Sequence, residues 1–101
     1  MANDDYKEFL LEQLQDLDHA AEYLSECLKE GEDAFLVGLR DVVEVHGGIG
    51  ELSKNTELNR EGLYRMLSES GNPTLSSLSL ILENLGIEVK FTKKLEGSKA
   101  A

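Results

Sequence analysis

The chain has 101 residues, of which 41% are hydrophobic and 30% are charged, and its formal net charge is -10. This length gives one domain with a single small core, and the composition excludes a disordered chain. The apolar runs are too short for a membrane span or a signal peptide, one cysteine excludes an internal disulfide, and two distant histidines supply no metal-ligand set. We therefore expect a cytoplasmic protein that has no metal and no cofactor.

The negative charge is concentrated in the first part of the chain. Residues 1–45 contain 13 Asp or Glu and 3 Lys or Arg, whereas residues 46–101 contain 7 of each kind. The neutral part can bind DNA if its basic residues gather on one helix face. The acidic part suits a basic partner.

Helical spacing of apolar residues predicts three helices in residues 1–46. The first covers Tyr6 to Leu14, the second begins at an Asp16 N-cap and ends at Gly31, and the third begins at an Asp33 N-cap. Their apolar stripes consist of Tyr6, Phe9, Leu10 and Leu14, then Leu17, Ala20, Ala21, Leu24, Cys27 and Leu28, then Phe35, Leu36, Leu39, Val42 and Val43.

Two short helices and a longer one are expected after the glycines that follow His46. The first runs from Ile49 to Asn55, Asn59 caps the second, and Thr74 caps the last, which ends at Gly86. Two short helices joined by a tight turn form a helix-turn-helix. The residues predicted to face inward are Ile49, Leu52, Leu63, Met66, Leu67, Leu75, Leu78, Ile81, Leu82 and Leu85.

Residues 87–92 alternate apolar and polar side chains, with Ile87, Val89 and Phe91 on one side. This pattern predicts a half-buried strand. No second strand is evident, so we expect the strand to pair with its copy in a second subunit, which makes the protein a homodimer. Residues 96–101 are predicted to be a loose tail.

Residues 49–85 resemble the Xre-like helix-turn-helix of the lambda-repressor-like fold. Leu52 and Ser53 stand where that family has Leu-Ala, Leu58 takes the apolar place after the turn, and "NP" at 72–73 precedes the supporting helix. Glu57 departs from the pattern because the family favours glycine there. A positive φ at this glutamate would cost about 1 kcal/mol.

A wider resemblance covers roughly residues 6–92. The phrases "YKEFLLEQLQD", "AFLVGLRDVVEVHGGIGELS" and "LNREGLYRMLSESGNPTLSSL" are similar to the addiction-module antidote proteins, the HigA-like antitoxins. The resemblance implies an all-α fold of five or six helices, and a small basic toxin of the RelE/HigB kind that cleaves mRNA. It also implies inhibition of that toxin and repression of the antitoxin's own operon.

Three segments follow from this interpretation. Residues 1–32 form an acidic helical segment that is the candidate toxin contact, residues 33–95 form the DNA-binding domain with its strand, and residues 96–101 are the tail. A stand-alone prophage-type regulator without a toxin would use the same DNA-binding residues. An interaction module that has lost DNA binding is a third interpretation, which salt-dependent DNA binding would exclude.

The candidate DNA-binding residues centre on the second short helix. Arg60 and Arg65 can fork onto guanine or clamp phosphate, while Tyr64 either contacts the sugar-phosphate backbone or packs internally. Glu61 accepts from cytosine or pairs with Arg65 at i+4. Asn59 caps this helix, and the remaining candidates, expected to contact phosphates, are Lys54, Asn72 and Thr74.

Enzymatic interpretations are weak. His19 and His46 are far apart in the sequence, and Cys27 lies on an apolar stripe, where cysteine behaves as a small hydrophobic residue. We therefore expect a protein that is not an enzyme.

Overall fold

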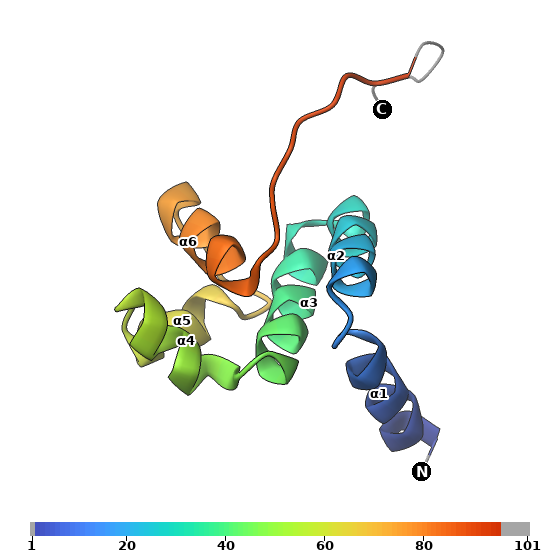
Figure 1. Cartoon of the computed structure of the whole chain (residues 1–101), viewed down its shortest axis with the longest axis horizontal. Helices are drawn as coiled ribbons and strands as arrows, with labels where there is room; N and C mark the ends of the chain where they lie inside the picture. The colour runs from blue at the N-terminus through green and yellow to red at the C-terminus, as the bar shows by residue number, and fades with distance from the viewer. Residues whose placement is uncertain (1, 96–101) are drawn as a thin grey trace.

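A computed structural model describes residues 2–95, so the tail predicted for residues 96–101 lies outside the described residues. Its six helices are α1 (Ala2–Gln13), α2 (Leu17–Glu30), α3 (Glu32–Val45), α4 (Gly48–Thr56), α5 (Arg60–Met66) and α6 (Leu75–Leu85) (Figure 1). The all-α class predicted from the sequence is confirmed for residues 2–95. No helix within that range is both long and apolar enough to cross a membrane.

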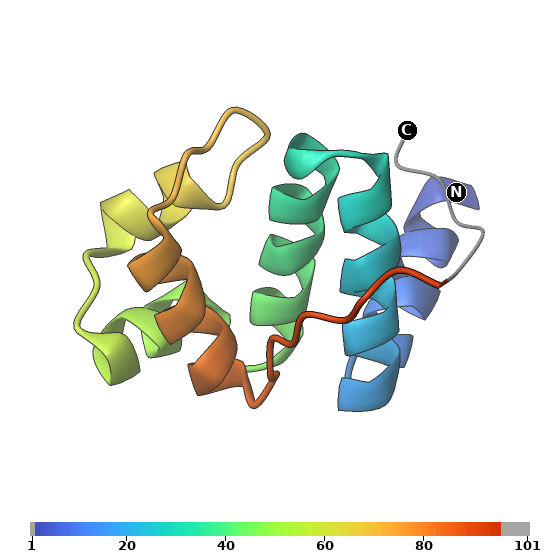
Figure 2. The same cartoon turned by 90° about the horizontal axis from the view of Figure 1, so that it is seen from above.

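Helix α3 lies at the centre of the arrangement. It packs lengthwise against α2, contacts α1 on one side and contacts α4 on the other, while α4 also contacts α5 and α6. Helices α1 and α5 therefore lie near opposite ends of the molecule, as both views show (Figures 1 and 2).

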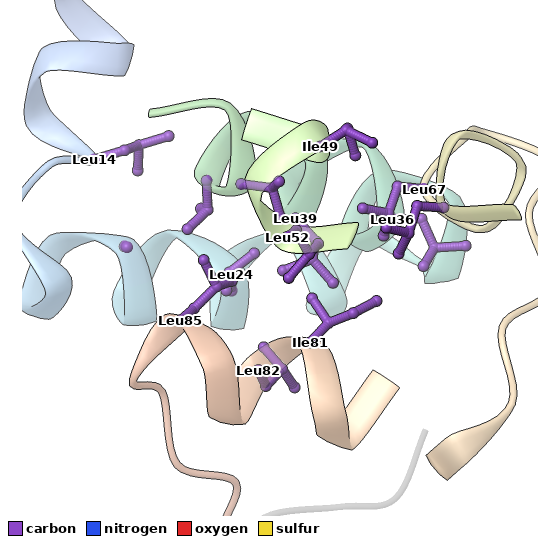
Figure 3. Packing of buried hydrophobic residues seen from close by; sticks show 14 residues of the cluster. Leu14, Leu24, Leu36, Leu39, Ile49, Leu52, Leu67, Ile81, Leu82 and Leu85 are labelled. Carbon is purple, nitrogen blue, oxygen red and sulfur yellow. The ribbon is translucent and has the colours of Figure 1, made fainter. Parts of the chain in front are cut away.

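A single buried cluster joins these helices (Figure 3). Leu39, Val42 and Val43 of α3 are at its centre, with almost no exposed surface. Burying such side chains is the main favourable contribution to folding. Leu36 also belongs to α3. The other members come from α2, α4, α5 and α6 and from positions that directly follow a helix: Leu14, Ala20, Leu24, Ile49, Leu52, Leu63, Leu67, Ile81, Leu82 and Leu85.

Three of the four predicted N-caps are confirmed. The Asp16 carboxylate accepts from two backbone amides of α2, the Asn59 side chain accepts from the amide of Gly62, and the Thr74 hydroxyl accepts from the amide of Ser77. The prediction for Asp33 is wrong. Helix α3 begins at Glu32, because Gly31, at φ 139°, reverses the chain directly into α3 without a side-chain cap.

The predicted strand over residues 87–92 is wrong for the single chain. Residues 87–95 form no strand, and Phe91 is 98% exposed. A strand needs a second strand to pair with its backbone, and residues 2–95 contain no other strand. The predicted pairing across a homodimer stays a prediction.

The apolar stripes are only partly covered. Leu75, predicted to face inward, is 80% exposed because it stands in the first turn of α6, beyond the cluster, and Leu28 of α2 is 54% exposed. Leu78, Ile81, Leu82 and Leu85 of the same stripe pack into or against the core, as predicted.

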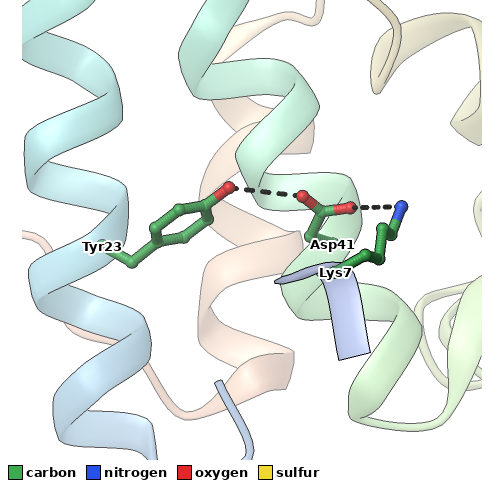
Figure 4. Close-up of polar contacts among 3 residues, drawn as sticks. All are labelled: Lys7, Tyr23 and Asp41. Carbon is green, nitrogen blue, oxygen red and sulfur yellow. Dashed lines mark hydrogen bonds and ion pairs between the residues drawn. The ribbon is translucent and has the colours of Figure 1, made fainter. Parts of the chain in front are cut away.

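Helix α1 is fastened to the body mainly by its C-terminal end. Leu14, which follows it, is buried, and the Leu14 carbonyl oxygen accepts from His46 Nε2 at 2.9 Å. Lys7 Nζ lies 3.6 Å from Asp41 Oδ1 on α3, and the Tyr23 hydroxyl of α2 donates to Asp41 Oδ2 at 3.3 Å (Figure 4). Asp41 thus ties α1 and α2 to α3.

Candidate nucleic-acid interface

In the turn between α4 and α5, the backbone at Glu57 adopts a conformation that is unfavourable for a glutamate. Glu57 adopts φ 64° and ψ 12°, the left-handed conformation in which an L side chain is strained. Hydroxyls on α4 hold the turn: Ser53 Oγ donates to the carbonyl of Leu58, and Thr56 Oγ1 accepts from the Leu58 amide at 3.3 Å. These bonds fix the entry of the chain into α5 despite the glutamate.

Helix α5 has a buried inner face and an exposed outer face. Leu63 and the following Leu67 are fully buried. The outer side chains, all exposed, are four of the predicted site residues, Arg60, Glu61, Tyr64 and Arg65. They are brought together because positions i, i+1, i+4 and i+5 share one side of a helix.

Arg40, which the sequence analysis did not single out, joins this surface. Its guanidinium carbon lies 5.2 Å from the centroid of the Tyr64 ring, so α3 adds a third arginine beside α5. This is a cation–π distance. Arg40 is separated by 24 positions from Tyr64, and its position at the edge of the apolar stripe of α3 gave no sign of its partner.

The sequence left two alternatives open, one for Tyr64 and one for Glu61. Tyr64 makes an internal contact through Arg40 while 42% of it stays exposed, so packing and external contact coexist. The Glu61–Arg65 ion pair is not formed, because no nitrogen of Arg65 lies within 4.0 Å of a carboxylate oxygen of Glu61. Both groups are therefore available to a partner.

The other candidates come from neighbouring elements. Lys54 is exposed in the last turn of α4, and the Thr74 hydroxyl is occupied with Ser76, Ser77 and the helix cap. Asn72 is exposed and lies in the wall of a groove lined also by residues of α2 and α3. Thr74 thus supports α6, and Asn72 belongs partly to a different surface.

Cys27 and His46, which could supply nucleophilic or acid-base chemistry, have structural roles in this protein. Burial raises the pKa of the Cys27 thiol, which disfavours the reactive thiolate. His46 donates to a backbone carbonyl. Within residues 2–95, no three His, Cys, Asp or Glu side chains gather as a metal site would require.

The chain is similar to a known family of proteins. A family model described as "probable addiction module antidote protein" matches residues 5–93. An uncharacterized protein of Haemophilus influenzae is 29% identical over 89 residues, which cover 78% of this chain and 91% of that relative. No solved structure matches the chain. Because the family model spans most of the sequence, the chain belongs to the family of probable addiction module antidote proteins.

Proposed function

We propose that this protein is the antitoxin of a type II toxin-antitoxin module, and that it neutralises a RelE/HigB-like toxin and represses its own operon. Membership in the antidote family implies a toxin partner of unspecified kind. Two parts of the proposal go beyond family membership: that the toxin is of the RelE/HigB kind, and that the protein represses its own operon. The protein would act by binding, in the cytoplasm, without a catalytic step.

The outer face of α5 is the observation that carries the DNA-binding part of the proposal. Arg60, Tyr64 and Arg65 are exposed there, and Arg40 adds its charge from α3. In a helix-turn-helix the second helix enters the major groove, where arginine forks onto guanine. Asn59, Glu61, Lys54, Asn72 and Thr74 would complete the contacts with bases and phosphates.

A homodimer would read a palindromic operator. Two copies of α5 would enter successive major grooves, with half-sites about 10 to 10.5 bp apart or a multiple of that spacing. Residues 87–95 are where we place the dimer contact, since pairing would cover the exposed Val89 and Phe91.

We attribute neutralisation of the toxin to the negative charge of the α1–α3 region. An mRNA-cleaving toxin must bind a polyanion, and the acidic α1–α3 region can compete for the same positive surface. Operator DNA would bind at the α5 end of the molecule, away from α1 (Figure 1).

Two measurements test the proposal. Under this proposal we expect the neighbouring reading frame to encode a small basic toxin. That toxin should arrest growth when it is expressed alone, and co-expression of the antitoxin should restore growth. A gel shift on DNA upstream of the gene should show binding that weakens steeply with salt. Arrest that persists with both proteins would contradict the antitoxin role, and the absence of salt-dependent binding would contradict repression.

A further inference from the structure

Helix α1 exposes two aromatic side chains on its outer side. Tyr6 is 68% exposed and Phe9 is 59% exposed, although both belong to the apolar stripe of the helix. They lie three positions apart, so they are neighbours on the helix surface. Large exposed aromatic groups that lie together mark interaction sites in soluble proteins.

Three carboxylates of α1 lie beside Phe9. Asp5, Glu8 and Glu12 stand at i, i+3 and i+7 beside Phe9, and together with Phe9 they line a shallow depression of about 470 Å³ on α1. The basic side chain of Lys7 is directed to Asp41 of α3, 3.6 Å away (Figure 4). The exposed side of α1 therefore places two aromatic rings next to three carboxylates.

The position of α1 leaves this face accessible. Helix α1 contacts α3, and it lies at the end of the molecule opposite α5 (Figures 1 and 2). The polar ties of α1, through Lys7 and the Leu14 carbonyl, fix its direction without covering Tyr6 or Phe9. The aromatic face is thus held in place and uncovered in the single chain.

We infer that the toxin docks on this outer face of α1, with Phe9 and Tyr6 entering an apolar depression of the toxin and with Asp5, Glu8 and Glu12 meeting its basic side chains. Charge complementarity selects a basic protein as the occupant. The inference rests on the proposed function, because it gives the toxin of that module its contact site. Buried aromatic anchors with a charged rim are the usual anatomy of a specific interface.

A second apolar surface serves as the comparison. The groove between α2, α3 and α6, of about 560 Å³, is lined by Leu28, Phe35 and Leu75 and also by Ile87 and Val89, where the C-terminal segment begins. Its continuity with residues 87–95 associates it with the dimer contact proposed above. Leu28 is 54% exposed, close to the value for Phe9, which makes it a matched control.

The test uses the full-length protein and the basic toxin that the proposed function expects beside its gene, with affinity measured by calorimetry. Phe9→Ser and Tyr6→Ser should each weaken binding by about 30-fold, as expected for interface anchors, whereas Leu28→Ser should change it by less than about threefold. Phe9→Ser and Tyr6→Ser should retain the thermal unfolding midpoint and the operator affinity of the wild type, because these two side chains are exposed and α1 lies away from α5.

Charge reversal tests whether the toxin is attracted by the carboxylates of α1 or by the negative charge of residues 1–45 as a whole. Glu8→Lys with Glu12→Lys should lower the association rate at low salt far more than Glu30→Lys with Asp33→Lys, which makes the same change of charge near the α2–α3 turn. Equal effects of the two pairs would overturn the assignment of the site to α1. So would wild-type affinity in Phe9→Ser and Tyr6→Ser. No binding by the wild-type chain would contradict the proposed function itself, and the docking assignment with it.

Discussion

Arg40 of α3 stacks over the ring of Tyr64 on α5, with its guanidinium carbon 5.2 Å from the ring centroid. The contact links the central helix to the candidate recognition helix. It also places a positive charge from the acidic part of the sequence on the surface that we assign to DNA.

Removing this charge should weaken DNA binding. We expect Arg40→Gln to lower operator affinity and, if the guanidinium meets a phosphate, to reduce the slope of log affinity against log salt by about 1. Lys29→Gln on α2 removes the same charge from a different surface, and it should leave both values unchanged. A gel shift over a range of salt would decide, and identical curves for Arg40→Gln and the wild type would exclude Arg40 from the interface.

Arg60 and Arg65 should carry sequence recognition. Arg60→Ala and Arg65→Ala should each weaken operator binding by about 1–3 kcal/mol if the side chain reaches a base edge. Toxin binding should be preserved, since α5 and α1 lie at opposite ends. Normal gel shifts by both variants would show that this face of α5 does not read DNA.

Glu57 carries backbone strain that glycine would relieve. Because its φ is 64°, we expect Glu57→Gly to raise the free energy of unfolding by about 1 kcal/mol, equivalent to a rise of roughly 4–8 °C in Tm. Asn55→Gly, in the last turn of α4, should instead cost a few tenths of a kcal/mol, about the difference in helix propensity. Thermal unfolding of the two variants tests the sign.

Gly38 allows α2 and α3 to approach closely. A Cβ there would lie 2.7 Å from Cys27 Sγ and 3.2 Å from Tyr23 Cε2, so Gly38→Ala should destabilise by about 1–3 kcal/mol. Adding Cys27→Ala should recover part of the loss. Gly50→Ala meets no atom within 4 Å and should stabilise α4 by about 0.5–1 kcal/mol. Chemical denaturation that ranked the two alanine variants equally would contradict this packing.

Stability should fall in alkaline solution because of Tyr23 and Cys27. Burial raises the pKa of the Tyr23 hydroxyl above 10.0, with Cys27 and Asp41 adding to the effect, and burial raises the pKa of Cys27 above 9.0. The folded state keeps both groups neutral after the unfolded chain has ionised them. Their contribution is therefore complete below about pH 9 and is lost as the pH rises further.

Urea midpoints at about pH 8 and about pH 10.5 would measure this loss. Tyr23→Phe should show a smaller decline than the wild type. Tyr6→Phe, at an exposed position, is the control for removing a phenol hydroxyl, and it should decline as the wild type does. A decline in Tyr23→Phe as steep as that of the wild type would assign the alkaline instability to other groups.

The local features of the fold were predictable from local chemistry. Asp16, Asn59 and Thr74 each cap a helix through bonds to amides two or three residues away, so sequence neighbours determine them. The position of Glu57 in the turn is likewise local.

Features that depend on distant partners were not predictable. Periodicity marks an apolar face, but it does not say whether another helix covers it, and Phe9 and Leu75 are exposed for that reason. Arg40 depends on how α3 crosses α5. The strand predicted at 87–92 does not form in the single chain, because alternation describes the two faces of a strand and supplies no backbone partner.

The continuous cluster around α3 limits how this protein can be taken apart. Leu14 and Leu24 from the acidic end share one hydrophobic interior with Ile81 and Leu85 from the other end. Removing residues 1–32 would open that interior to water and destabilise α3, α5 and α6, which remain. The protein therefore cannot be divided into two fragments that each fold alone. The roles of the α1 surface and the α5 surface must be distinguished by point substitutions, not by truncation.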